Sequence, residues 1–140
     1  MDQLRLMLQQ LPQNKPLLEL QLTVAGVISE AFKMFGEIPV VVGGSAVEFY
    51  TLGNYTTRDI DMIVEDPEYI KTVMTGLGFC NEAGTWYLPA NPSIVVEFPK
   101  GPLAGDSKRI QPVQLPNKHT AYLISLDDII IDRTLAAKHC

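Results

Sequence analysis

Two carboxylates separated by one residue are the feature of the sequence that most strongly indicates chemistry. Asp59 and Asp61 begin the run DIDMIV, whose alternation is typical of a β-strand. Because successive side chains on a strand point to opposite faces, both carboxylates share one face, and Ile60 and Met62 share the other. The two carboxylates repel each other, and Mg²⁺ takes carboxylate oxygens together with substrate phosphates. The pair therefore predicts either an acidic strand end at the surface or a metal site for phosphoryl chemistry.

A third carboxylate, Glu97, interrupts a later apolar strand that runs from Ser93 to Phe98. A charge inside such a strand is costly unless it has a partner or a function. A neighbouring strand in the right register would set Glu97 beside Asp59 and Asp61. Two metal ions held about 3.5–4 Å apart by such a set clamp the attacking and leaving oxygens of a phosphoryl transfer. The alternative interpretation of Glu97 is an edge-strand charge that faces solvent.

A Gly-Gly-Ser turn follows the short apolar strand predicted at Ile38 to Val42. Gly43 and Gly44 would let the backbone approach a phosphate closely. Ser45 can cap the helix that follows, and the free N–H groups at a helix N-terminus attract anions. The turn and the acidic strand together predict one triphosphate–metal site, although a Gly-Gly-Ser triplet alone is usually a plain turn.

This combination resembles the nucleotidyltransferase superfamily with the DNA polymerase beta fold, in its small bacterial forms. That family carries a Gly-Ser pair that opens a helix, Asp-x-Asp on the next strand, and a third acid on a later strand. The matching residues here are Gly44, Ser45, Asp59, Asp61 and Glu97. The match runs from Ile38 to Phe98, and the final helix, SLDDIIIDRTLAAK, also looks like those forms. Two residues depart from the pattern: the third acid is most often Asp, and Tyr55 stands where small forms often carry Arg.

The resemblance implies transfer of a nucleoside monophosphate from an NTP, such as ATP, to a hydroxyl of a small molecule, an RNA end or a protein. It implies that Asp59 and Asp61 hold two Mg²⁺ or Mn²⁺ ions, and that Glu97 holds one of them and serves as general base. The residues it places against the triphosphate are Gly43, Gly44, Ser45 and Arg58. Similar proteins include antibiotic nucleotidyltransferases and the nucleotidyltransferase halves of toxin–antitoxin pairs.

Two other functions stay open. One is a catalytically inactive nucleotidyltransferase-fold protein that binds a partner, as an antitoxin or a regulatory subunit. Exposed apolar surface on the terminal helices, without nucleotide binding, would favour it. The other is a phosphate-binding metal hydrolase, which would release phosphate or pyrophosphate and leave no nucleotidylated product. The P-loop pattern GxxxxGK[ST] and the dinucleotide fingerprint GxGxxG are both absent from the sequence.

The elements around these residues predict a mixed α/β (α+β) fold with helices packed on one sheet. Gly36 is a predicted helix stop, and Asp66 with Pro67 is a predicted helix start. The segment from Pro99 to Pro116 is rich in proline and glycine and is predicted to be the least ordered. The expected helices are 2–11, 17–35, one from Ser45 to about Leu52, 67–77 and one from Ser125 onward. Besides the strands already named, a hairpin is expected over 79–89 with its turn near 82–84, and a strand at 120–124.

Length and composition predict one domain over residues 1–140, long enough to bury a core. We expect N-terminal helices over 1–36, a catalytic core over 38–98, and a strand and C-terminal helix over 119–140. The net charge of -5 disfavours duplex DNA as a partner, because phosphate backbones are bound through Lys and Arg. The expected partners are a nucleotide, a hydroxyl acceptor, and a protein partner or a second copy of the chain.

Localisation follows from the termini and the cysteines. No apolar run is long enough to span a bilayer, so no membrane partner is expected, and the first ten residues lack the apolar stretch of a signal peptide. Cys80 and Cys140 do not form a disulfide framework, which predicts a cytoplasmic protein with reduced thiols. Cys80 is expected to be a small apolar filler rather than a reactive thiol.

Overall fold

The computed structural model describes residues 2–11, 17–42, 59–99, 111–114 and 119–123. Its helices are α1 (Asp2–Gln9), α2 (Leu17–Lys33), η1 (Pro67–Tyr69) and α4 (Ile70–Gly76). Its strands are β1 (Val40–Val42), β2 (Asp59–Ile63), β3 (Cys80–Glu82), β4 (Thr85–Leu88), β5 (Asn91–Glu97), β6 (Gln111–Gln114) and β7 (Thr120–Leu123). Among these residues, no helix has the length and apolar character that crossing a bilayer requires.

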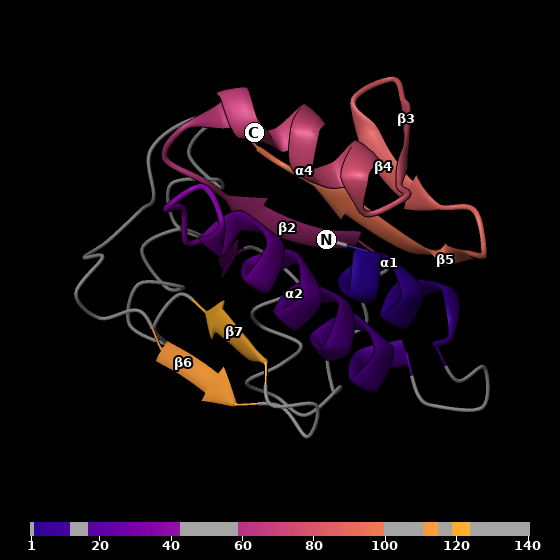
Figure 1. Ribbon diagram of the computed structural model, residues 1–140, viewed down its shortest axis with the longest axis horizontal. Helices are drawn as coiled ribbons and strands as arrows, with labels where there is room; N and C mark the ends of the chain where they lie inside the picture. Colours follow the sequence, from indigo (N-terminus) through magenta and orange to yellow (C-terminus); the bar gives the residue numbers. More distant parts are fainter. Residues whose placement is uncertain (1, 12–16, 43–58, 100–110, 115–118, 124–140) are drawn as a thin grey trace, which may run out of the picture.

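One mixed sheet organises the described residues, with the strand order β3-β4-β5-β2-β1-β7-β6. The α-helices α1, α2 and α4 lie on one face of this sheet (Figure 1). β2 is antiparallel to β1 and parallel to β5, and β1 is parallel to β7. The predicted α+β class with helices packed on one mixed sheet is therefore confirmed.

The core fills the space between the helices and the sheet. The alternation in DIDMI directs Ile60 and Met62 into this core, where both side chains are fully buried. β5 repeats the pattern with Ile94 and Val96. From the helices come apolar side chains that are also fully buried, namely Val24, Ala25, Val27, Ile28, Ala31, Phe32, Val73 and Met74. Burying a side chain of this kind contributes about 1.5–3 kcal/mol, so the core fixes which face of β2 and β5 points away from the helices.

The C-terminal end of α2 is closed by a Schellman motif. Gly36 has a φ of 74°, which suits a residue without a Cβ atom. Its N–H donates to the carbonyl of Lys33 at 3.1 Å, and the N–H of Glu37 donates to the carbonyl of Phe32 at 3.2 Å. The predicted helix stop at Gly36 is confirmed, and the chain then turns directly into β1.

The helix after β2 starts where the sequence indicates. Asp66 is its N-cap, and the Asp66 carboxylate accepts a hydrogen bond from the N–H of Glu68 at 3.0 Å. Pro67 occupies the first helical position, where its missing N–H costs nothing. A 3₁₀ turn, η1, leads into α4, which ends at Gly76, close to the predicted end at residue 77.

A two-residue turn joins β3 to β4. Ala83 and Gly84 both have positive φ values, 54° and 87°, which is typical of the type I′ turn of a β-hairpin. The carboxamide oxygen of Asn81 accepts a hydrogen bond from the N–H of Gly84 at 3.2 Å and stabilises this turn. The predicted hairpin is confirmed, and Trp86 on β4 packs into the core with 8% of its surface exposed.

One prediction is wrong, and two predicted helices lie beyond the described residues. Cys80 is exposed rather than an apolar filler, because it lies on β3, at the end of the sheet order. β6 lies inside the segment predicted to be least ordered, with Pro112 paired to Tyr122 of β7. β6 is at the other end of the sheet order, and edge strands tolerate proline because one side needs no N–H donors. The helices predicted from Ser45 to about Leu52 and from Ser125 onward lie outside the described residues.

Candidate functional site

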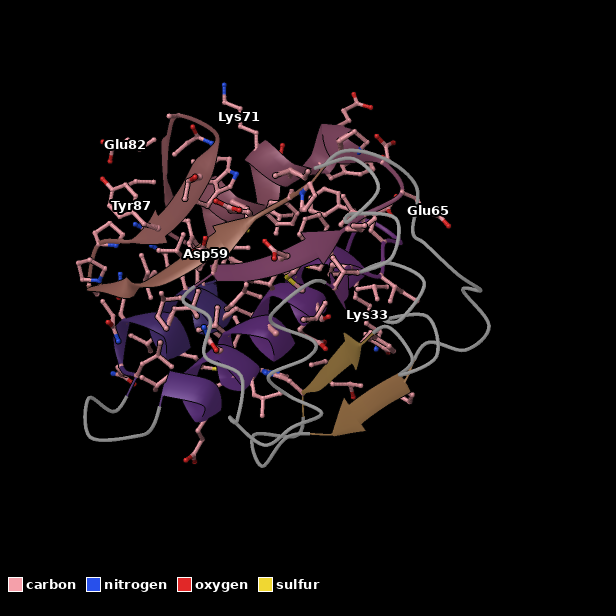
Figure 2. The ribbon with its side chains drawn as sticks, turned by 180° about the vertical axis from the view of Figure 1, so that it is seen from behind. Lys33, Asp59, Glu65, Lys71, Glu82 and Tyr87 are labelled. Carbon is pink, nitrogen blue, oxygen red and sulfur yellow. The ribbon has the colours of Figure 1, made fainter. Side chains whose placement is uncertain are left out.

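The site is built on the face of β2 that points away from the core. Asp59 and Asp61 are half-buried, whereas Ile60 and Met62, which alternate with them on β2, are fully buried on the opposite face. Figure 2 views the molecule from the side opposite to Figure 1 and shows Asp59 on β2, with the helices behind the sheet. We call this surface of β2, β5, β4 and β3 the open face.

The parallel pairing of β2 with β5 brings Glu97 to the same surface. Asp59 pairs with Val95, and Asp61 pairs with Glu97. Neighbouring strands lie about 4.8 Å apart, and paired residues share a face, so Glu97 stands directly beside Asp61. Glu97 is half-buried, like the two aspartates. The structure thus places Asp59, Asp61 and Glu97 together on the open face, on two adjacent strands.

The other neighbour of Glu97 is Thr85 on β4. Trp86 pairs with Val96 in the antiparallel β4–β5 ladder, so the preceding residue, Thr85, lies across from Glu97. The Thr85 hydroxyl donates a hydrogen bond to Glu97 Oε1 at 3.4 Å, in a partly buried position. Sequence reasoning missed Thr85. The Ala83–Gly84 turn fixes the β3–β4 register, but no local pattern relates β4 to β5.

The donor chemistry of the open face suits a hard cation. Carboxylate oxygens are the ligands that Mg²⁺ prefers, and Asp59, Asp61 and Glu97 carry carboxylates on two adjacent strands. Among the described residues, no three His, Cys, Asp or Glu side chains form a group that could hold a metal ion as they stand. The backbone register brings the three carboxylates to one face, but their side chains do not converge into a metal site in the described part of the chain.

The phosphate-binding residues predicted from the sequence lie outside the described residues. These are Gly43, Gly44, Ser45 and Arg58. Val42, which immediately precedes Gly43 in the chain, is the β1 partner of Asp61. Asp61 therefore has Glu97 on one side and the last described residue before the Gly-Gly-Ser segment on the other. The assignment of that segment to phosphate binding stays a prediction.

Tyr87 continues the open face across the hairpin. It pairs with Val95 on one side and with Cys80 on the other, in the same cross-strand row as Asp59. The negative charge of the Cys80 thiolate raises the pKa of the Tyr87 phenol above its usual value. Desolvation, a hydrogen bond with Cys80 and the charge of Glu82 act in the same direction. The phenol of Tyr87 is therefore harder to ionise than that of a free tyrosine.

Comparison with known proteins gives one match. A family model described as "Nucleotidyltransferase of unknown function (DUF6036)" matches residues 23–139. No curated protein and no solved structure matches the chain. The matched range begins within α2 and spans every strand of the sheet, so it includes Asp59, Asp61 and Glu97.

Proposed function

Because the chain belongs to the DUF6036 family, which is described as a nucleotidyltransferase family of unknown function, we propose that it transfers a nucleoside monophosphate from an NTP to a hydroxyl acceptor with the help of Mg²⁺. The observation that carries this proposal is the parallel register of β2 and β5, which sets Glu97 beside Asp61 and puts Asp59 on the same face. A surface carboxylate pair would not need a third acid in register with it.

In the proposed reaction the acceptor oxygen attacks the α-phosphorus of the NTP. A new P–O bond forms, the bond between the α-phosphorus and the oxygen that bridges to the β-phosphorus breaks, and pyrophosphate leaves. Glu97 takes the proton of the acceptor hydroxyl, because a positioned carboxylate can act as general base. Bound Mg²⁺ would neutralise the charge that develops on the phosphate oxygens.

The residues of the site are proposed to bind either the metal ions or the triphosphate. Asp59 and Asp61 are proposed to hold both metal ions, and Glu97 one of them. The residues proposed for the β- and γ-phosphates are Gly43, Gly44, Ser45 and Arg58. The pairing of Val42 with Asp61 supports this arrangement, because the chain passes directly from the neighbour of the central carboxylate into the Gly-Gly-Ser segment.

Labelling with radioactive nucleotides tests the proposal. The protein is incubated with Mg²⁺ or Mn²⁺ and each α-³²P-labelled NTP, with and without cell extract, and nucleotidylated products are separated from free pyrophosphate. We expect a labelled product that the double variant Asp59→Asn, Asp61→Asn does not make. Glu65→Gln is the matched control, because Glu65 is an exposed carboxylate that follows β2. Labelling that survives the double substitution would show that the site is wrongly assigned.

The alternative is a catalytically inactive nucleotidyltransferase-fold protein that works by binding a partner. One observation favours it: apolar side chains are exposed after α2, with Met34 58% and Ile38 54% exposed. Exposed apolar side chains that lie together in one patch are typical of an interaction surface. Binding of a fluorescent NTP analogue separates the two functions. If the folded protein neither binds any NTP nor forms a labelled product, the result favours the inactive form.

A further inference from the structure

Three large apolar side chains are exposed where α2 ends and the chain turns toward β1. Met34 is 58% exposed, Phe35 37% and Ile38 54%. We call these three residues the apolar patch. Leu6, the other large apolar side chain that is exposed among the described residues, lies on α1, away from this end of α2 (Figure 1). A group of exposed apolar side chains with a polar rim is typical of an interaction surface.

Contacts with neighbouring elements hold the apolar patch in place. Phe35 stacks on Tyr69 of η1, with ring centroids 4.9 Å apart and an interplanar angle of 29°. The Schellman motif at Gly36 ends α2 with two backbone hydrogen bonds and so fixes the path of the chain toward Ile38. The patch is therefore a defined surface of the folded chain.

Two carboxylates flank Ile38. Glu37 directly precedes it in the chain. Val40 pairs with Ile63 in the antiparallel β1–β2 ladder. Ile38 and Glu65 each lie two residues beyond that pair, so both lie at the same end of the ladder, and Glu65 is exposed. A partner that covers Ile38 therefore approaches negative charge.

The side of the apolar patch next to η1 is also acidic. Asp66 caps η1, and Glu68 is exposed in its first turn. Lys33 is the basic residue in the last turn of α2. Lys71, on α4, extends away from Glu65 in Figure 2. The surroundings of the patch thus contain four carboxylates and one ammonium group.

We propose that the apolar patch binds a short segment of another protein in which apolar side chains lie next to Lys or Arg. Charge complementarity selects this occupant, because like charges that meet across an interface oppose association. A second copy of the chain would bring the same acidic rim against the first. Three partly exposed side chains also offer only a small part of the roughly 800 Å² that each partner buries in a stable complex of two folded proteins. The inference goes beyond nucleotidyl transfer and does not depend on it.

Synthetic peptides test the proposal on the full chain. The probe is a fluorescein-labelled helical peptide of Leu and Lys, and the comparison peptides consist of Leu with Glu and of Ser with Lys. Fluorescence anisotropy measures the affinity. We expect the Leu/Lys peptide to bind at least about 10-fold more tightly than either comparison peptide, because only the Leu/Lys peptide matches both the apolar patch and its rim.

Substitutions locate the binding surface. Met34→Ser and Ile38→Ser should each weaken binding of the Leu/Lys peptide about 10-fold, as loss of a central interface residue does. Leu6→Ser is the matched control, because Leu6 is 49% exposed but lies on α1, and it should bind as wild type does. Urea unfolding checks that each variant is folded, which is expected for exposed positions.

The rim is tested through the association rate, since charges at the edge of an interface act mainly on that rate and on its salt dependence. Glu65→Gln should slow stopped-flow association of the Leu/Lys peptide at low salt and reduce its salt dependence. Glu82→Gln should do neither, because Glu82 is also exposed but lies on β3, far from Glu65 (Figure 2).

Three results would overturn the proposal. They are equal peptide affinity in Ile38→Ser and Leu6→Ser, equal affinity of the wild type for the Leu/Lys and Leu/Glu peptides, and a wild type that dimerises in sedimentation while Ile38→Ser stays monomeric. The last result would show that a second copy covers the apolar patch. Nucleotidylation by Ile38→Ser should equal that of wild type, so a failure of this proposal is distinguishable from a failure of the proposed function.

Discussion

The β3–β4 turn allows a stabilising substitution to be predicted. Among the described residues, Ala83 is the one non-glycine residue with a positive φ, at 54°. A Cβ atom in this left-handed conformation costs roughly 1–2 kcal/mol, and asparagine tolerates it better than alanine does. Asn-Gly is also the preferred pair for a type I′ turn. We therefore expect Ala83→Asn to raise the free energy of unfolding by about 0.5–1 kcal/mol, somewhat less than the full cost to alanine.

Thermal unfolding followed by circular dichroism measures this gain. For a chain of this size, each kcal/mol shifts Tm by about 2–4 °C, so Ala83→Asn should raise Tm by roughly 1–4 °C. Ala90→Asn is the matched control: Ala90 is an exposed alanine in the turn between β4 and β5, and its φ is not positive. It should leave Tm unchanged. A Tm that falls in Ala83→Asn, or that rises equally in both variants, would contradict the assignment of strain to Ala83.

Three further predictions concern the core, the end of α2 and the open face. Phe32→Ala removes a fully buried ring that lies 6.0 Å from the ring of Phe98, and urea unfolding should show a loss of about 3–5 kcal/mol. Gly36→Ala places a Cβ at φ 74° with nothing within 4 Å; backbone strain alone should then cost about 1 kcal/mol in urea unfolding, and Gly36→Asn less. Cys80→Ser removes the main cause of the raised pKa of Tyr87, so absorbance at 295 nm should show one tyrosine titrating at lower pH than in wild type.

The raised pKa of Tyr87 also gives stability a pH dependence with a defined sign. The folded state holds the phenolic proton more tightly than the unfolded state, in which a tyrosine titrates near pH 10. The contribution is therefore fully present below about pH 10 and is lost as pH rises through the raised pKa. Wild type should lose more stability than Cys80→Ser in this alkaline range, and equal losses would contradict the coupling.

Local patterns were sufficient to predict the elements that carry the site. The alternation of Asp59, Ile60, Asp61 and Met62 indicates a strand with one acidic face. Acidic and apolar residues alternate here, and successive side chains on a strand also alternate between its two faces. The starting residues Asp66 and Pro67 and the stop at Gly36 have specific backbone requirements, so their positions were also predictable. These predictions needed no knowledge of how the elements pack.

The relation between distant elements could not be predicted in the same way. Nothing in the residues around Glu97 specifies that β5 pairs with β2 rather than with another strand, or in which register. The contact between Thr85 and Glu97 depends on the β4–β5 ladder, whose register shifts between Tyr87 and Leu88, so it was missed. β6 was missed because its proline argues against a strand until the strand is known to lie at the end of the sheet order.

The parallel direction of β2 and β5 has a consequence for synthesis of the chain. Parallel neighbours cannot be joined by a tight turn, and here η1, α4 and the β3–β4 hairpin lie between them. A growing polypeptide therefore exposes Asp59 and Asp61 well before their partner on β5 has left the ribosome. Long-range pairings of this kind form slowly, so a nascent or truncated chain that ends before Glu97 should be unable to assemble the acidic cluster.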